Sequence, residues 1–421
     1  MKTNDFSPNT GHHAHHGAAG ATTMLGPTEE HIAREDAWGA HNYHPLDLVI
    51  ERAEGAWVTD VDGKRYLDCL SAYSAVNQGH CHPLILATLV EQASRVTLTS
   101  RAFRNDQLGA FCEELAQVCG MEMVLPMNTG AEAVETAIKA ARRWGYRVKG
   151  IPDGQATIIA FENNFHGRTT TIVGFSSEPS YREHFGPFAP GFVLVPFGDI
   201  DAVRKAMTGN TCAVLFEPIQ CEAGVLIPPD GFVQQLAELC REQNVLLVAD
   251  EIQTGLGRTG RMFACDHDGV KPDMYVLGKA LSGGFYPVSA VVSSREVLGV
   301  FGPGSHGSTF GGNPLGCAVA RTALRVIQDE SLVEKSAELG AWFLSQVRAI
   351  SLPSIKDVRG RGMMVAIELD VPARPFCEAL KERGMLCKET HDFVLRLSPP
   401  LVTSRTDLAW AVTQLQAVFS A

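Results

Sequence analysis

Three short apolar runs in the middle of the chain are each followed by residues that can do acid–base or covalent chemistry. These residues are Glu217 after run 213–216, Asp250 after run 245–248, and Lys279 after run 274–277. A lysine directly after a buried run is unusual, because lysines normally occupy exposed faces. A partly buried lysine with a lowered pKa can form a Schiff base with a carbonyl compound. Lys279 is therefore the strongest candidate for a catalytic residue.

The surrounding residues match the needs of pyridoxal phosphate (PLP). This cofactor requires a lysine, an acid for the ring nitrogen, donors for the phosphate and a flat group against the ring. Lys279 supplies the lysine, and Asp250 can keep the ring nitrogen protonated. Residues 129–131 open a predicted helix, where free backbone N–H groups favour an anion, and Phe165 can stack on the ring. Each feature alone has an ordinary structural explanation, but together they predict a PLP site.

The middle of the chain has the pattern of an α/β domain. Unbroken apolar runs are typical of strands buried on both faces of a parallel sheet, and they occur at 157–161, 213–216, 245–248 and 274–277. Pro229 to Gln243 carries apolar residues at helical spacing, so strand, helix and strand make a βαβ unit. Thr129 and Glu132 fit a capping box, which predicts a helix start. Ligands bind beyond the carboxyl ends of such strands, where the polar residues lie.

The C-terminal part predicts a smaller α+β domain. A long helical stretch near Ala318 to Leu344 precedes strand patterns at 365–369 and 393–397, and the second alternates around Arg396 as in a sheet with one covered face. An early hairpin is predicted to turn at Asp62-Gly63. The predicted organisation is a flexible tail (1–35), an N-terminal segment joining the small domain (36–78), a large PLP-binding α/β domain (79–325) and a small α+β domain (326–421).

Composition narrows the possible partners. The chain has 421 residues, 45% hydrophobic and 20% charged, as in globular proteins of more than one domain. A formal net charge of −11 argues against nucleic acid and anionic membranes. We find neither an apolar run of about 20 residues nor a targeting pattern at the start. Eleven scattered cysteines without a C-x-x-C pair suit a reducing compartment, so we expect a cytoplasmic protein.

The histidines do not predict a metal site. A His-rich stretch in the tail lacks a ligand set, and we favour a disordered segment for His12, His13, His15 and His16. In the triplet 80–82, adjacent side chains of an extended chain would point to opposite faces and would not converge on one ion. We therefore predict no bound metal.

On these residues the sequence resembles the class III, or ω-, aminotransferases, from about Ala37 to about Leu415. The motifs are SAYSAVNQGH (71–80), MNTGAEA (127–133), ADEIQTG (249–255), LGKALSGG (277–284) and HGSTFGGNP (306–314). The Tyr73 block and 185–188 look like the branch that acts on ornithine. The resemblance implies an α/β protein of fold type I, with a large mostly parallel-sheet domain and a smaller α+β domain. It also implies a homodimer with active sites at the subunit interface.

The matching motifs imply which residues hold the cofactor. Those that would contact the PLP ring are Lys279 by a Schiff base, Asp250 at the ring nitrogen, Phe165 by stacking and Gln253 near the ring hydroxyl. Those that would bind the phosphate are Gly130 and Ala131 through their backbone, helped by Ser308 and Thr309 of the partner subunit. Once freed, Lys279 would move the proton between substrate and cofactor as a general acid–base.

The resemblance also implies the substrates. Ornithine would give its δ-amino group to 2-oxoglutarate in two half-reactions, forming glutamate-5-semialdehyde and glutamate. Arg396 would grip the α-carboxylate of glutamate, and Glu222 would neutralise Arg396 while ornithine is bound, as a charge switch. Arg168 would take the far carboxylate, while Tyr43 and Tyr73 would hold the α-group of ornithine. Without the motifs, Arg396 and Glu222 would be interpreted as an ordinary ion pair.

Two residues depart from the family pattern, and they bear on the substrate rather than on the reaction. Cys221 stands where glycine is usual, and His166 stands where a bulkier aromatic is common. Alternatives are a related aminotransferase acting on acetylornithine, 4-aminobutyrate or lysine, a PLP aminomutase or decarboxylase, and a non-enzymatic binding protein with the same fold. Tyr73 argues against 4-aminobutyrate, because a smaller aliphatic residue is expected there in that branch.

Overall fold

The computed structural model describes residues 26–420, and the chain divides into two compact units between Val49 and Ile50. The first unit contains α1 (Pro27–Trp38), whose starting proline and acidic first turn suit a helix N-terminus. The tail histidines at 12, 13, 15 and 16 lie outside the described residues. The four predicted domain ranges stay predictions.

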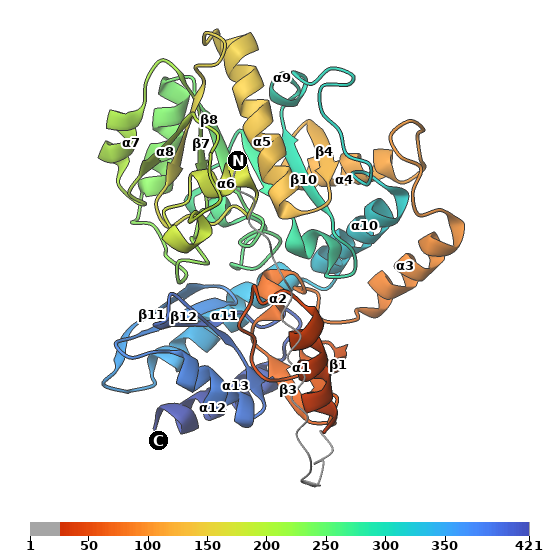
Figure 1. Ribbon diagram of the computed structural model, residues 1–421, viewed down its shortest axis with the longest axis vertical. Coiled ribbons are helices and arrows are strands. Elements are labelled where there is room, and N and C mark those ends of the chain that lie inside the picture. The colour runs from red at the N-terminus through yellow and green to blue at the C-terminus, as the bar shows by residue number, and fades with distance from the viewer. Residues whose placement is uncertain (1–25, 421) are drawn as a thin grey trace, which may run out of the picture. The chain divides into compact units, whose positions relative to one another are not determined.

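A seven-stranded sheet forms the centre of the second unit (Figure 1). In sheet order its strands are β4 (Met123–Met127), β10 (Ser289–Ser293), β9 (Met274–Leu277), β8 (Leu246–Asp250), β7 (Thr211–Phe216), β5 (Thr157–Phe161) and β6 (Phe192–Val195). The strands from β6 to β9 are parallel, and β10 runs antiparallel to β9 and β4. The four runs predicted as buried strands are confirmed, which establishes the α/β class.

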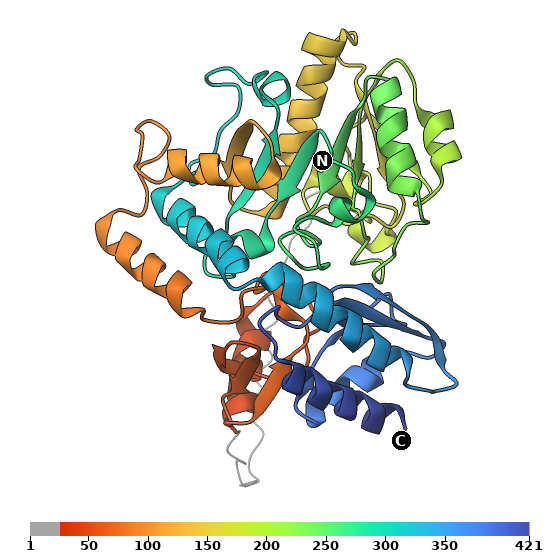
Figure 2. The same cartoon turned by 180° about the vertical axis from the view of Figure 1, so that it is seen from behind.

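Helices pack on this sheet or on one another beside it. They are α4 (Leu108–Cys119), α5 (Gly130–Trp144), α6 (Thr170–Gly174), α7 (Ile200–Ala206), α8 (Phe232–Glu242), α9 (Arg295–Leu298) and α10 (Pro314–Asp329). The predicted capping box at the start of α5 is confirmed, since Thr129 accepts from the Glu132 backbone and Glu132 accepts from the Thr129 backbone. Helix α3 (Pro83–Arg95) lies against α10 in both views (Figures 1 and 2).

The unit has two further four-stranded sheets, of which the first joins its start to its end. One has the order β1 (Ile50–Glu54), β2 (Trp57–Asp60), β3 (Arg65–Asp68) and β13 (Met385–Leu386). The other has the order β11 (Ile355–Arg361), β12 (Met364–Leu369), β15 (Val394–Leu397) and β14 (Lys388–Thr390). The predicted hairpin at 62–63 is confirmed, because β2 and β3 pair antiparallel around it. Helices α11 (Leu332–Arg348), α12 (Arg374–Glu382) and α13 (Arg405–Phe419) pack with these strands.

Two local predictions were wrong. The long helical stretch is two helices, α10 and α11, because Ser331 adopts a left-handed backbone (φ +53°) between them. Strand β15 does not have one exposed face, since all four of its residues are buried. Arg396 is tolerated inside because a carboxylate pairs with it.

The histidines of the triplet 80–82 and the cysteines are separate side chains with no shared site among the described residues. His80 contacts Asp68 and His82 contacts Glu330, each at 2.8 Å, so their rings face different partners. All eleven cysteines are free thiols, and Cys81 is the exposed one. Among residues 26–420, no helix is long and apolar enough to cross a membrane.

Candidate active site

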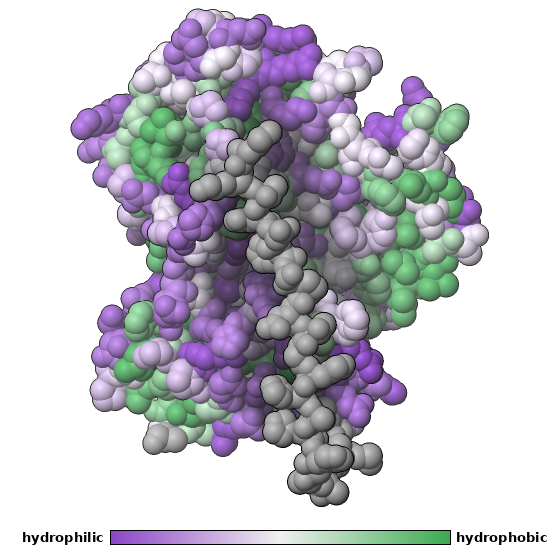
Figure 3. Space-filling model, viewed as in Figure 1, coloured by the Kyte–Doolittle hydropathy of each residue, from purple (hydrophilic) through white to green (hydrophobic). Residues whose placement is uncertain are grey.

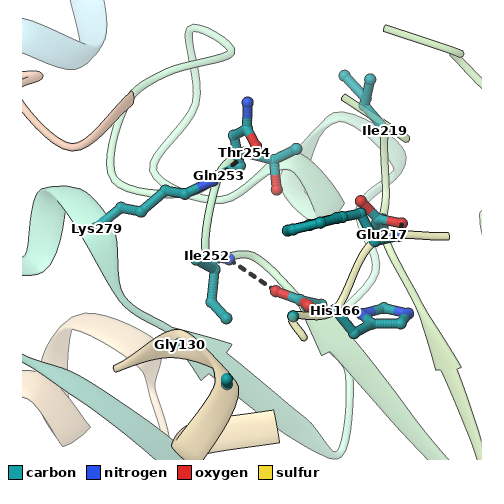
Figure 4. A pocket seen from close by; sticks show the side chains of 12 residues that line it. Gly130, His166, Glu217, Ile219, Ile252, Gln253, Thr254 and Lys279 are labelled. Atoms are coloured by element: carbon teal, nitrogen blue, oxygen red, sulfur yellow. Dashed lines mark hydrogen bonds and ion pairs between the residues drawn. The ribbon is translucent and has the colours of Figure 1, made fainter. Parts of the chain in front are cut away.

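The carboxyl ends of β7, β8 and β9 lie side by side and define a pocket. Because these strands are parallel neighbours, the residues that follow them gather at one edge of the sheet. They enclose a cavity of about 200 Å³, lined by Gly130, Ala131, Phe165, His166, Gly167, Glu217, Ile219, Asp250, Ile252, Gln253, Thr254 and Lys279. Figure 4 shows Lys279 and Gln253 on one side of it, with Glu217 and His166 on the other.

Lys279 is held in the pocket by its backbone and by one hydrogen bond. It follows β9 with a left-handed backbone (φ +44°) and begins a short 3₁₀ turn. Its Nζ donates to Gln253 Oε1 at 2.7 Å. Burial lowers the pKa of the Lys279 amine, although the negative charges of Glu222 and Asp250 oppose that shift. The amine therefore gives up its proton more readily than a surface lysine does.

Asp250 is buried and is fixed by two hydrogen bonds. One carboxylate oxygen accepts from the Ile252 backbone N–H at 3.1 Å, and the other lies 2.7 Å from His166 Nδ1. His166 Nε2 is buried without a partner among the described residues. Because a carboxylate oxygen only accepts hydrogen bonds, we assign a proton to His166 Nδ1, which donates to Asp250.

Glu217 is a second buried acid of the pocket. Its Oε2 accepts from the Phe165 backbone N–H at 3.0 Å. Burial and the nearby charge of Asp250 raise the pKa of Glu217 well above its ordinary value. Asp250 accepts two hydrogen bonds and Glu217 accepts one, so a negative charge on Asp250 is the better stabilised of the two.

The start of α5 forms the floor of the pocket. Gly130 and Ala131 are its first residues, so their backbone N–H groups have no intrahelical acceptor. A Cβ at Gly130 would lie 3.0 Å from Ile252 Cδ1, which leaves little space for a side chain. Ser308 Oγ accepts from Asn128 Nδ2 of the same chain at 2.9 Å. The predicted contacts of Ser308 and Thr309 across a subunit interface stay predictions.

Arg396 and Glu222 meet as an ion pair at 2.7 Å. Arg396 is 4% exposed, and its guanidinium carbon lies 5.2 Å from the centre of the Tyr73 ring. Burial would raise the pKa of Glu222, but the positive charges of Arg396 and Lys279 outweigh it, and the pKa is lowered. Cys221 points instead to Met364 Sδ and the Ile219 carbonyl, so it leaves this pair intact.

The remaining predicted residues have different surroundings. The Arg168 guanidinium lies 3.7 Å from the centre of the Tyr181 ring and 5.5 Å from that of Phe165. Phe165 lines the pocket and meets Tyr181 edge to face. Tyr43 belongs to the N-terminal unit, where its side chain is 78% exposed, and its role stays a prediction.

Sequence reasoning missed three residues of this region. His166 was named only as a departure from the family pattern; it lines the pocket, and its contact with Asp250 was not predicted. Glu217 was noted only as a residue after a strand, and Tyr181 was not considered. The position of His166, a titratable residue directly after the candidate stacking residue, was a usable signal. Tyr181 ends a three-residue 3₁₀ turn (Pro179–Tyr181), which has no recognisable sequence pattern.

Residues 38–419 match the family model for class III aminotransferases, and the chain therefore belongs to this family of PLP-dependent enzymes. It is similar to the ornithine aminotransferase of Bacillus subtilis (strain 168), with 59% identity covering 94% of this chain and 99% of the relative. A solved ornithine aminotransferase from Toxoplasma gondii, with partial occupancy of PLP at its active site, has a TM-score of 0.92 and 45% identity, covering 93% and 94%. The acetylornithine aminotransferase from Elizabethkingia anophelis has a TM-score of 0.86 and 48% identity, covering 93% and 99%.

Proposed function

We propose that this aminotransferase uses PLP to move the δ-amino group of L-ornithine to 2-oxoglutarate. The observation that carries the proposal is the buried Arg396–Glu222 pair, which lies against Tyr73 and close enough to Lys279 for their charges to interact. The curated relative from Bacillus subtilis, at 59% identity, supports the same substrate. The products would be glutamate-5-semialdehyde and glutamate.

The residues present fit PLP. The cavity of about 200 Å³ adjoins a second of about 300 Å³, and both are lined by Gly130 and Lys279. Together they fall within the range of about 300–1,000 Å³ that small-molecule sites occupy. A half-buried lysine, a hydrogen-bonded acid, a half-buried helix start and the Phe165 ring would each contact a different part of the cofactor. When bound, PLP supplies an electron sink that stabilises negative charge on the substrate carbon.

Lys279 would hold the cofactor and later move the proton. Its lowered pKa favours the neutral amine, which can accept a proton from the substrate carbon and return it to another atom. Gln253 accepts from Lys279 and keeps its Nζ directed into the pocket. Asp250, held by His166 and the Ile252 backbone, would keep the ring nitrogen protonated.

The Arg396–Glu222 pair would let one pocket accept two unlike substrates. While paired, Arg396 offers no net charge to the carboxylate of ornithine, so the δ-amine can enter first. When Glu222 turns away, Arg396 becomes a bidentate clamp for the α-carboxylate of 2-oxoglutarate or glutamate. Arg168, which is exposed, would bind the far carboxylate.

We also propose a homodimer, in which Ser308 and Thr309 of the partner subunit complete the phosphate site. Hydrophobic side chains gather over α3, where Leu84, Leu86 and Val90 are 58%, 43% and 60% exposed (Figure 3). Such a patch supports an interface, because it is costly to leave in water. Light scattering of the holoenzyme tests this proposal: a monomer mass would contradict it. The cytoplasmic location stays a prediction.

The first experiment is the absorbance spectrum of the purified protein with PLP, before and after L-ornithine is added. A yellow band that disappears with ornithine and returns with 2-oxoglutarate supports both half-reactions. A band that ignores ornithine but responds to acetylornithine, 4-aminobutyrate or lysine keeps the class and overturns the substrate. Absence of any band would contradict the role of Lys279.

A further inference from the structure

The segment that carries Tyr73 has an unusual backbone. Four consecutive residues, Ser71, Ala72, Tyr73 and Ser74, have φ values of +48°, +47°, +57° and +70°. Residues with a Cβ avoid this left-handed region, and a run of them persists only where the surroundings hold it. We propose that Ser71 and Arg258 are positioning residues that hold this left-handed turn and so fix Tyr73 against Arg396. The inference rests on the proposed function, in which Tyr73 and Arg396 contact the substrate.

The turn is fixed at its start by one carboxylate. Asp68 Oδ1 accepts from the backbone N–H groups of Leu70 and Ser71, at 2.8 and 2.9 Å. Its other oxygen lies 2.8 Å from His80 Nε2. These bonds set where the turn begins, but they do not connect it to Arg396.

The Ser71 hydroxyl makes that connection. It donates to the Ser398 carbonyl at 2.6 Å and accepts from Arg258 Nη2 at 3.0 Å, which uses its single proton and one lone pair. Ser398 lies two residues after Arg396, and Tyr73 lies two residues after Ser71. The contacts 71–398 and 73–396 are therefore two successive links between the same two segments.

Arg258 holds the other side of the turn. It is completely buried, and it donates through Nη1 to the carbonyls of Met363 and Pro399 and through Nη2 to Asn77 as well as Ser71. All four acceptors are neutral oxygens. Its planar fork thus joins three other chain segments, and one of them, at Pro399, lies two residues after the strand that carries Arg396.

A role in stability alone would predict a different outcome from a role in positioning. If the turn only stabilises the fold, loss of the Ser71 hydroxyl lowers stability but leaves the preference among amine donors unchanged. If the turn positions Tyr73, loss of the Ser71 hydroxyl lowers the preference for ornithine over 4-aminobutyrate. The reason is that the Tyr73 ring, which would contact the amine donor, is displaced.

The chain supplies a matched control within the same turn. Ser74 is also buried and left-handed, but its Oγ has no hydrogen-bond partner among the described residues. We expect Ser71→Ala to raise KM for ornithine by roughly five- to tenfold, as for the loss of a hydrogen bond, and to reduce the ornithine to 4-aminobutyrate preference by a similar factor. The kcat for a saturating donor should change less than KM. Ser74→Ala should change both quantities less than about twofold.

A second variant and a second readout keep the inference testable. Arg258→Lys keeps a positive charge but loses the fork, and it should shift the donor preference in the same direction as Ser71→Ala. In the unsubstituted holoenzyme, hydrogen exchange should be slow at the Tyr73 and Ala75 amides, which donate to backbone carbonyls within the turn. Rapid exchange there would overturn the inference even if neither variant folds.

The outcomes separate this inference from the proposed function. If the unsubstituted enzyme does not convert ornithine, the substrate assignment fails, while amide exchange still decides whether the turn is held. If the enzyme converts ornithine but Ser71→Ala and Ser74→Ala behave alike, the function stands and the inference is overturned.

Discussion

The two sides of the pocket are built in different ways. The side that would hold the cofactor lies at the carboxyl ends of three neighbouring parallel strands, where Asp250 ends β8, Glu217 follows β7 and Lys279 lies two residues after β9. The side that would recognise the substrate is assembled from distant segments, because Tyr73 and Arg396 meet only through a left-handed turn and a buried ion pair. The first side follows from the sheet, whereas the second depends on a few side-chain contacts.

We infer from this difference that the cofactor side controls the reaction, whereas the substrate side controls which substrate is used. Residues at strand ends are fixed by the whole sheet, so their positions are insensitive to single substitutions elsewhere. The Tyr73 turn is strained by roughly 1–2 kcal/mol per left-handed residue, and small changes nearby can move it. We therefore expect substitutions on the first side to abolish chemistry, and those on the second to change which substrate is used.

The largest effect is expected at Lys279. Lys279→Ala removes the group that would hold PLP and move the proton, so the yellow band of the holoenzyme should be lost and kcat should fall by at least about 10³-fold. Lys271→Ala is the matched control, since this exposed lysine precedes the same strand at its opposite end. A Lys279→Ala protein with normal turnover would refute the assignment of the cofactor side.

On the substrate side, Arg396→Met should affect the second substrate most. The loss of the carboxylate clamp should raise KM for 2-oxoglutarate by about 10–100-fold, while the half-reaction with ornithine is affected less. The control is Arg374→Met, which breaks ion pairs with Glu378 and Glu389 instead. Equal losses in both half-reactions, measured by single-turnover absorbance, would contradict the charge switch.

The same pair predicts a dependence of stability on acid. The pKa of Glu222 is lowered in the fold from an ordinary value of 4.5. A lowered carboxyl pKa contributes stability that is complete above the unfolded pKa and is lost as pH falls through the folded pKa. The destabilisation caused by Arg396→Met should therefore shrink below about pH 4.5, as measured by denaturant unfolding.

Local patterns made part of the fold and site predictable. Lys279, Asp250 and the start of α5 were found because each is marked by its immediate neighbours in sequence. The His166–Asp250 contact spans 84 residues and the Ser71–Ser398 contact spans 327, and such pairs leave no local pattern. The left-handed turn and the break at Ser331 were missed because glycine, the usual sign of that backbone, is absent from both.

The protonation of Glu217 decides whether the cofactor side carries one negative charge or two. Its pKa is raised in the fold, so the folded protein binds a proton that the unfolded chain releases above its ordinary pKa of 4.5. Stability should thus decline as pH rises from there toward the folded pKa. Glu217→Gln cannot ionise and can still accept from Phe165, so it should remove that decline and be more stable than the unsubstituted protein near pH 7. Glu217→Ala, which loses the acceptor for the Phe165 N–H, should be destabilised. A decline that persists in Glu217→Gln would show that Glu217 is not the group that titrates.

The smallest effect concerns the strain in the turn that carries Tyr73. Ala72 is exposed and left-handed, so its Cβ costs roughly 1–2 kcal/mol that glycine avoids. Glycine loses about 0.5–1 kcal/mol of chain entropy in return, so Ala72→Gly should stabilise the fold by about 0.5–1 kcal/mol in denaturant unfolding. The same substitution at Ala409, which is exposed within α13, should destabilise it by a similar amount. If both substitutions destabilise, the turn is not strained, and the contrast between the two sides of the pocket loses its physical basis.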